Sequence, residues 1–304
     1  MDGILVVAKP VGPTSHDIVG LVRRLSATKR VGHGGTLDPF ASGVLPVFLG
    51  RATRLVEYHL ADRKRYRATV CFGASSTTDD LEGALTPVPG PAPTRDAVAA
   101  ALAAFHGEID QRPPAYSAIK VAGRRAYAMA RAGETVELAT RRVTIHDIKI
   151  VDWDDATTGE PVAIVDVECS AGTYVRSLAR DLGTAVGSAA YLGALTRTAS
   201  GPFDLDDAIS VDDVRAAAEA GSNRLAGLLE PIDTGLELPT VTVPPGSVGA
   251  LGRGQAIGVP PGTGPLPSDE PLRLIDAAGE LLAIGRLVGT KLAPDKVLIA
   301  ADAG

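Results

Sequence analysis

The chain has 304 residues, of which 45% are hydrophobic and 22% are charged, and its formal net charge is -6. These values fit a globular protein with one large domain, or a large and a small one, and they exclude a uniformly basic polyanion binder. No apolar run approaches the ~20 residues that cross a bilayer as a helix. The N-terminus lacks the leader of a signal peptide, and two cysteines do not make a disulfide scaffold, so we expect a cytoplasmic protein.

The charge is unevenly distributed along the chain. Residues 1–67 carry 11 Lys and Arg against 5 Asp and Glu, whereas residues 201–304 carry 7 against 15. A local excess of positive charge allows a basic face for phosphates on the N-terminal part.

The chain begins with an apolar run, Gly3 to Ala8, that is typical of a buried strand. A loop rich in Pro and Gly follows Lys9, which on its own reads as a surface lysine. Thr14 or Ser15 then caps a helix that we expect to run to Leu25.

The most informative stretch is the Gly- and His-rich segment 31–46, which contains a single carboxylate, Asp38. Pro39 pushes Asp38 toward an extended conformation, and the glycines permit an irregular loop. We expect a stiffly presented carboxylate beside the imidazole of His33. The pattern alone is equally compatible with an Asp38 that only caps a turn.

A basic cluster, residues 63–67, surrounds Tyr66 in a run that alternates like a strand. Basic side chains attract phosphates, and an aromatic face can stack on an exposed base. The alternative is a half-buried strand tyrosine with a solvated basic edge.

The segment 73–93 is rich in Gly, Thr, Asp and Pro, and we expect a loop. Its two carboxylates, Asp79 and Asp80, could suggest acid–base or metal chemistry. Because the sequence offers no further ligands nearby, we expect them to be solvated. Thr94 then caps an alanine-rich helix through Phe105.

Between residues 111 and 142 there are seven basic and two acidic residues, together with Tyr116, Tyr127 and Lys120. This insertion is typical of a loop that grips RNA, although a plain basic loop is the competing interpretation.

A strand at residues 162–169 leads through Gly172 into a helix, which places Arg176 at the mouth of a cleft or in an ordinary ion pair. Leu192 has the periodicity of a core residue. From residue 235 onward we expect a small β-rich domain, because Pro and Gly dominate residues 231–268 and short strands follow.

Six motifs resemble the TruB family of pseudouridine synthases and lie in the family's order between Lys9 and Arg197, about two thirds of the chain. They are Lys9-Pro10-x-Gly12-x-Thr14-Ser15, Gly32-His33-x-Gly35-x-Leu37-Asp38-Pro39 with Gly43-x-Leu45-Pro46, Lys64-Arg65-Tyr66, Pro113-Pro114-x-Tyr116-Ser117-Ala118-x-Lys120, Gly172-Thr173-Tyr174-x-Arg176 and Tyr191-Leu192-x-x-Leu195-x-Arg197.

The resemblance implies a role for several residues. Asp38 would be the nucleophile, Arg176 would pair with it, and Tyr66 would pack on the base and take part in proton removal. The remaining substrate-binding residues would be His33, Tyr174, Leu192, Lys9 and Lys120. An arginine beside Asp38 would lower its pKa and keep it ionised.

The fold that the resemblance implies is α+β, with a mixed, mainly antiparallel sheet, flanking helices and a central RNA-binding cleft. Residues 1–234 would form the catalytic domain, with residues 111–142 as its thumb, and residues 235–304 a small domain resembling a PUA domain. The acidic charge of that domain weakens the expectation that it binds RNA strongly.

The activity implied is isomerisation of the uridine at position 55, in the T-arm of tRNA, with no cofactor, no metal and no obligate protein partner. We expect a monomer. Three alternatives stay open: a related synthase acting on another RNA or guided by one, an RNA-folding chaperone using the same surface, and a carbohydrate hydrolase using Asp38 with Asp79 or Asp80.

Overall fold

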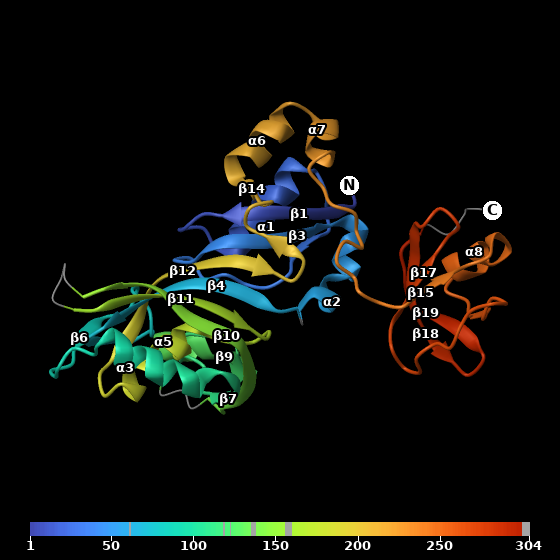
Figure 1. Ribbon diagram of the computed structural model, residues 1–304. Coiled ribbons are helices and arrows are strands. Elements are labelled where there is room, and N and C mark those ends of the chain that lie inside the picture. Colours follow the sequence, from blue (N-terminus) through green and yellow to red (C-terminus); the bar gives the residue numbers. More distant parts are fainter. Residues whose placement is uncertain (61, 118, 122, 135–137, 156–159, 300–304) are drawn as a thin grey trace.

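A computed structural model describes residues 1–60, 62–117, 119–121, 123–134, 138–155 and 160–299 (Figure 1). The helices are α1 Ser15–Leu25, α2 Val56–Leu60, α3 Arg95–Leu102, α4 Ala126–Arg131, α5 Val175–Ala185, α6 Val211–Glu219, α7 Ser222–Ala226 and α8 Pro245–Gly252, with 3-10 turns η1 Gly50–Arg54 and η2 Ala103–Phe105. The strands are β1 Gly3–Lys9, β2 Val31–His33, β3 Ser42–Leu49, β4 Lys64–Phe72, β5 Ala74–Ser76, β6 Leu85–Pro87, β7 Gly107–Gln111, β8 Lys120–Val121, β9 Arg124–Arg125, β10 Arg141–Asp154, β11 Val162–Cys169, β12 Ala190–Ser200, β13 Phe203–Asp204, β14 Ile209–Ser210, β15 Thr240–Thr242, β16 Ile257–Gly258, β17 Leu272–Ile275, β18 Leu281–Val288 and β19 Lys291–Val297.

A ten-stranded sheet forms the body of the protein, with the order β14-β1-β3-β12-β4-β11-β10-β7 and with β13 and β2 pairing beside it. The pairs β1–β14 and β3–β12 are parallel, and the other neighbours are antiparallel. The predicted α+β fold with a mixed, mainly antiparallel sheet is therefore confirmed.

Two separate groups of helices cover the two halves of this sheet (Figure 1). Helices α1, α6 and α7 pack with β1 and β3, whereas α3 and α5 pack under β4, β11 and β10. Helix α1 starts where the sequence predicts, because Thr14 and Asp17 form a reciprocal capping box. The junction between the halves lies at β12, which pairs with β3 on one side and with β4 on the other.

The core beside the cleft is aliphatic and follows the sequence pattern. Strand β11 has the predicted bounds and buries every second residue against α5 and α3. Helix α5 begins at Val175 and turns its apolar stripe onto β12 and β4, which brings Arg176 to the sheet.

Part of segment 73–93, predicted as a loop, forms a short hairpin of β5 with β6. The predicted thumb begins and ends at neighbouring points, because Gln111 of β7 pairs with Arg141 of β10.

A second, five-stranded sheet, β15-β17-β18-β19-β16, carries helix α8 and contacts the main body through η1 and α2. Leu55 packs with Leu281 and Leu298, and the Arg51 guanidinium donates to the Leu298 carbonyl oxygen at 2.7 Å. Figure 1 shows this small domain beside the α2 end of the body. The division of the chain at residue 234 stays a prediction.

In the described part of the chain, none of the helices is both long and apolar enough to cross a bilayer.

Candidate active site

Asp38 lies on the loop between β2 and β3, and Ser15 of α1 and Gly12 of the loop before it bond to the residues on either side of Asp38. The Ser15 hydroxyl accepts from the Leu37 amide at 2.8 Å and donates to the Leu37 carbonyl at 3.0 Å. The Gly12 amide donates to the Pro39 carbonyl at 2.8 Å. Both neighbours of Asp38 are thus pinned, which presents the carboxylate stiffly, as the Pro-flanked sequence predicts.

Lys9 is only 1% exposed, so its interpretation as a surface lysine is wrong. Its Nζ donates to the carbonyl oxygens of Pro10, Pro13 and Pro39 at 2.9, 2.8 and 3.4 Å. Burial lowers the pKa of its amine to about 8, opposed by the charge of Asp38. Lys9 supports the Asp38 loop from beneath, and this geometry does not favour a direct contact with substrate.

Arg176 reaches Asp38 from the first turn of α5, across 138 residues of sequence, with an Nη2–Oδ2 distance of 3.1 Å. The predicted pair of Asp38 and Arg176 is therefore present. The same guanidinium contacts a second carboxylate, since its Nη1 lies 3.2 Å from Asp80 Oδ2. It also donates to the carbonyl oxygens of Thr78 and Tyr116. Arg176 is thus fixed from four directions.

The pKa of the Asp38 carboxyl is raised, mainly by burial. Arg176 and Lys9 oppose this shift, whereas the carboxylate of Asp80 adds to it. Arg176 acts in the predicted direction, but the expectation of a lowered pKa is wrong because burial in the cleft outweighs the guanidinium.

Asp80 is 2% exposed, so the expectation of a solvated carboxylate is wrong. Its Oδ1 accepts from the Thr78 hydroxyl at 2.5 Å and from the Glu82 amide at 3.0 Å. Asp79 is also engaged, with its Oδ2 2.7 Å from Nη1 of Arg180. A polar composition alone predicted solvent exposure, whereas the hairpin folds both side chains inward onto arginines of α5.

Leu192 does not line the cleft. It is 0% exposed in the core beneath the sheet, and its backbone pairs with the Asp79–Leu81 turn: its amide donates to Asp79 and its carbonyl accepts from Leu81, both at 3.0 Å. Leu195, three residues later, lines the cleft instead. The role carried over to Leu192 therefore stays a prediction, whereas Leu195 fits this geometry.

The register of β12 puts Leu192 and Leu195 on the same face of the sheet, where they pair with Val70 and Ala68 of β4. A bulge at Gly193 interrupts the pairing with β4, and the buried positions change from even to odd numbers there. A Cβ at Gly193 would lie 2.6 Å from the Cys71 sulfur, so the close approach requires glycine. After the bulge, Leu195 and Arg197 face the cleft.

A cavity of about 830 Å³ opens over Asp38. Tyr66, Tyr174 and Arg176 line it as predicted, and Tyr116 and Tyr127 of the predicted thumb line it from the other side. Burial raises the pKa of the Tyr66 hydroxyl, although Arg197 opposes that shift. Such a pocket, which combines aromatic and aliphatic side chains with the Asp38 carboxylate, suits a planar base that has been extruded from an RNA loop.

The His33 ring lies beside the cleft rather than in its lining, with its Nδ1 accepting from the Gly35 amide at 3.3 Å and its ring edge-on to His16. Burial lowers its pKa, and the charges of His16 and Arg197 lower it further. The side chain of Lys120 lies outside the described part of the structure, so its predicted substrate contact stays a prediction.

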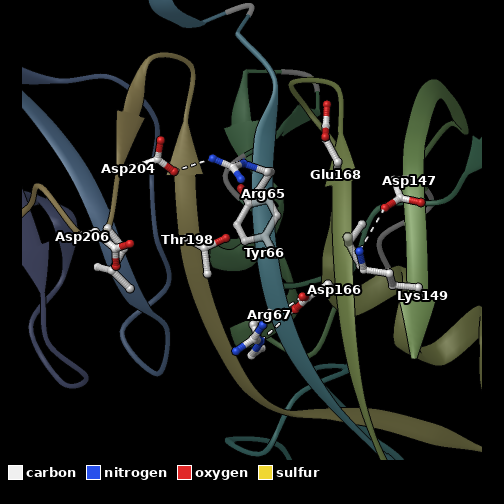
Figure 2. A pocket seen from close by; sticks show the side chains of 12 residues that line it. Arg65, Tyr66, Arg67, Asp147, Lys149, Asp166, Glu168, Thr198, Asp204 and Asp206 are labelled. Atoms are coloured by element: carbon white, nitrogen blue, oxygen red, sulfur yellow. Dashed lines mark hydrogen bonds and ion pairs between the residues drawn. The ribbon is translucent and has the colours of Figure 1, made fainter. Parts of the chain in front are cut away.

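The basic cluster around Tyr66 is largely neutralised on the outer face of the sheet (Figure 2). Arg67 forms a two-pronged pair with Asp166, at 2.8 and 2.9 Å, and Arg65 pairs with Asp204. Arg63 pairs with Glu168 through one contact of 3.1 Å. These acids lie on neighbouring strands and are distant in sequence from residues 63–67, so the local sequence did not reveal them. The prediction of a basic edge that attracts phosphates is not supported.

Among the residues that the structure describes, no group of three or more His, Cys, Asp and Glu side chains is placed to hold a metal ion. Asp38 and Asp80 both line the cleft but share one arginine.

Two family models match the chain in succession. Residues 23–175 match the "TruB family pseudouridylate synthase (N terminal domain)", and residues 176–237 match the "tRNA pseudouridylate synthase B C-terminal domain".

Curated relatives agree over most of the chain. Proteins named tRNA pseudouridine synthase B are 43% identical in Bradyrhizobium diazoefficiens, over 97% of this chain and 85% of that one, and 42% identical in Acaryochloris marina, over 98% and 99%. One from Thermobifida fusca is 49% identical over 71% and 75%.

Solved structures resemble the whole chain, including the small domain. One, described as an H/ACA RNP bound to a substrate RNA containing 2'-deoxyuridine, has a TM-score of 0.74 and 26% identity, covering 99% of this chain and 86% of that one. A Cbf5-Nop10-Gar1 complex gives 0.75 and 27% with the same coverage.

Proposed function

Because the chain belongs to the TruB family of pseudouridylate synthases, its reaction is the conversion of a uridine in tRNA to pseudouridine, and we propose that the uridine lies in the T-arm, at position 55, and that Asp38 is the nucleophile. The observation that carries the proposal is the pair of Asp38 and Arg176 at 3.1 Å, at the floor of a cavity lined by tyrosines. The family assignment argues against the carbohydrate hydrolase alternative.

The reaction needs few groups. The bond between N1 of the uracil and the anomeric carbon breaks, the uracil rotates, and a bond forms from C5 to the same carbon. The hydrogen on C5 leaves as a proton, and N1 gains one, so the reaction is balanced as an isomerisation. A uridine inside a folded RNA loop must first be extruded, and the cavity has the size and lining for a flipped base.

Each group of the site has a place in this sequence of steps. Asp38 attacks either the anomeric carbon or C6, and Arg176 fixes its carboxylate by a charge-assisted hydrogen bond. Tyr66, Tyr174 and Leu195 hold the base between aromatic and aliphatic faces. The Tyr66 hydroxyl is the group we propose for taking the C5 proton.

We propose that the protein acts in the cytoplasm, as a monomer and without an obligate protein partner. Its two free cysteines suit a reducing compartment. A sedimentation experiment on the purified protein, alone and with tRNA, tests this, and activity that requires an added protein would contradict it.

The test of the main proposal is release of tritium from C5 of a labelled uridine in full-length tRNA. We expect release by the wild type, loss of at least about 1,000-fold in Asp38→Asn, and no change in Asp212→Asn, a matched loss of an exposed carboxylate on α6. Release that persists in Asp38→Asn would remove Asp38 from the chemistry.

A tRNA transcript with cytidine in place of the T-arm uridine tests the position. If tritium from other uridines is still released at the wild-type rate, the target lies elsewhere. Binding of tRNA without any release, by a folded wild-type protein, would instead favour the RNA-chaperone alternative.

A further inference from the structure

Arg197 is a buried cation that the proposed reaction does not yet use. It is 1% exposed, although it lines the cleft that contains Asp38. Within the described residues, no carboxylate lies at ion-pair distance from it. A charge of this kind is costly to bury unless hydrogen bonds compensate for it.

The compensation comes from the catalytic loop. Nε of Arg197 donates to the Val44 carbonyl at 2.8 Å, and the two terminal nitrogens donate to the carbonyls of Gly35 at 3.1 Å and Thr36 at 3.4 Å. Thr36 lies only two residues before Asp38. Arg197 therefore connects the C-terminal part of β12 to the segment that positions the nucleophile.

The sheet places Arg197 directly between this loop and Tyr66. Arg197 pairs with Tyr66 across the antiparallel β12–β4 ladder and with Gly43 across the parallel β12–β3 ladder. A Cβ at Gly43 would lie 2.1 Å from the Arg197 carbonyl oxygen, so the glycine is what allows β12 to approach so closely. Directly opposed cross-strand residues have side chains within contact of each other.

The charge of the Arg197 guanidinium lowers the pKa of the Tyr66 hydroxyl, against the larger effect of burial, which raises it. The other groups that act on Tyr66 are Cys169 of β11 and Asp38, and both raise its pKa. Arg197 is thus the cation that favours the ionised form of this phenol.

Other cations lie nearby but are turned away from the phenol. Lys9 of β1 donates its amine to three loop carbonyls, and Lys64 of β4 donates to the carbonyls of His59 and Asp62. The third neighbour, His33 of β2, has a lowered pKa because of its burial.

We propose that Arg197 is a positioning residue of the reaction. It fixes the loop that carries Asp38, and its positive charge orients the Tyr66 hydroxyl toward the flipped base. The effect of Arg197 on the reaction rests on the proposed role of Tyr66 as the group that takes the C5 proton. The position of Arg197 in the structure does not depend on that role. The hydrogen bonds of Arg197 to the loop, and its pairing with Tyr66 across the β12–β4 ladder, exist without substrate.

The first test measures the phenol directly and does not depend on activity. A difluorinated tyrosine, whose hydroxyl titrates at lower pH, is incorporated at position 66, and its fluorine resonance is followed against pH. We expect the titration to move to higher pH in Arg197→Met and to stay close to the wild type in Arg197→Lys. Arg197→Gln, which keeps a donor without the charge, replaces Arg197→Met if that variant does not fold.

The second test uses single-turnover and steady-state kinetics with full-length tRNA. We expect kcat of Arg197→Met to fall by about tenfold to a hundredfold, with KM within about twofold and with partial recovery in Arg197→Lys. Arg95→Met, which removes an exposed arginine at the start of α3, serves as the control and should match the wild type.

Equal titration curves in wild type and Arg197→Met would overturn the proposal, and so would a rise in KM with kcat unchanged. Failure of the proposed role of Tyr66 gives a different result. Tyr66→Phe would then remain fully active, while the fluorine titration would still report the coupling to Arg197.

Discussion

The substitution Asp80→Asn distinguishes a buried ion pair, which the structure shows, from the solvated loop carboxylate that the composition predicts. In a solvated loop this substitution would alter stability by no more than about 0.5 kcal/mol. In the structure, Asp80 is 2% exposed and its Oδ2 lies 3.2 Å from the guanidinium of Arg176. We therefore expect a large destabilisation.

The magnitude follows from opposing effects. Two unit charges about 4 Å apart attract by about 4 kcal/mol at an effective dielectric constant of 20, and breaking a buried ion pair costs about 3–5 kcal/mol. Asp38 remains as a partner of Arg176, and its repulsion by Asp80 disappears. The amide oxygen of Asn can still accept from Glu82 or Thr78. We expect a loss of about 2–4 kcal/mol.

Urea denaturation at neutral pH measures this loss, with Glu82→Gln, an exposed change in the same hairpin, as the control. An Asp80→Asn protein that loses less than about 1 kcal/mol, or no more than the control, would refute the buried-pair reasoning.

Activity against pH gives a second readout of the same substitution. Asp80 raises the pKa of Asp38, so its neutralisation lowers that pKa. Because the nucleophile must be ionised, activity falls as pH drops through the Asp38 pKa, and we expect this acid limb to move to lower pH in Asp80→Asn. An acid limb that does not move would show that another group controls it.

Gly43→Ala should lower the free energy of unfolding, measured in urea, by at least about 3 kcal/mol, because φ of Gly43 is +110° and the new Cβ would meet the Arg197 backbone at 2.1–2.8 Å. A loss below about 1 kcal/mol would contradict the tight β3–β12 contact. The pKa of Lys9 is lowered to about 8 from its ordinary value near 10.5, so Lys9 binds fewer protons in the folded than in the unfolded state between these pH values. The free energy of unfolding of the wild type should therefore rise between about pH 8 and 10.5 relative to that of Lys9→Met. Stability curves of the two proteins that run parallel over this range would refute the reasoning. Arg67→Gln should leave the affinity for tRNA within about twofold, since its charge is engaged by Asp166 on the outer face; filter binding at several salt concentrations tests this, and a lower salt dependence would show a phosphate contact.

Local signals in the sequence were sufficient for much of the fold. The Thr14 cap and the strand at Val162–Cys169 are where the residue patterns predict them, and the helix predicted to follow Arg176 begins two residues earlier than Ser177, at Val175. Each depends on neighbours within one element, which a pattern can report.

The meeting of Asp38 with Arg176 could be expected only because of a resemblance, since residue types and spacing say nothing about contacts 138 positions apart. The partners of Arg65 and Arg67 show the same limit. Asp204 and Asp166 neutralise them from adjacent strands, and this arrangement depends on the register of the sheet.

Asp80 shows how a correct local pattern can still mislead. The composition of the hairpin is that of a surface loop, but a turn at Asp79–Leu81 pairs with the Leu192 backbone and directs Asp80 inward. The role carried over to Leu192 stays a prediction. The cavity is lined by Leu195, which the bulge at Gly193 keeps on the same face of the sheet as Leu192.

These observations identify β12 as the element on which the cleft is assembled. Its first part holds the Asp80 turn through the Leu192 backbone, its middle supplies Leu195 to the cavity, and its last part fixes the catalytic loop through Arg197. A central strand that is hydrogen-bonded on both sides moves little, so the groups that it carries or holds keep their geometry when the base enters. The single bulge at Gly193 connects these functions, because without it Leu195 and Arg197 would face away from Asp38.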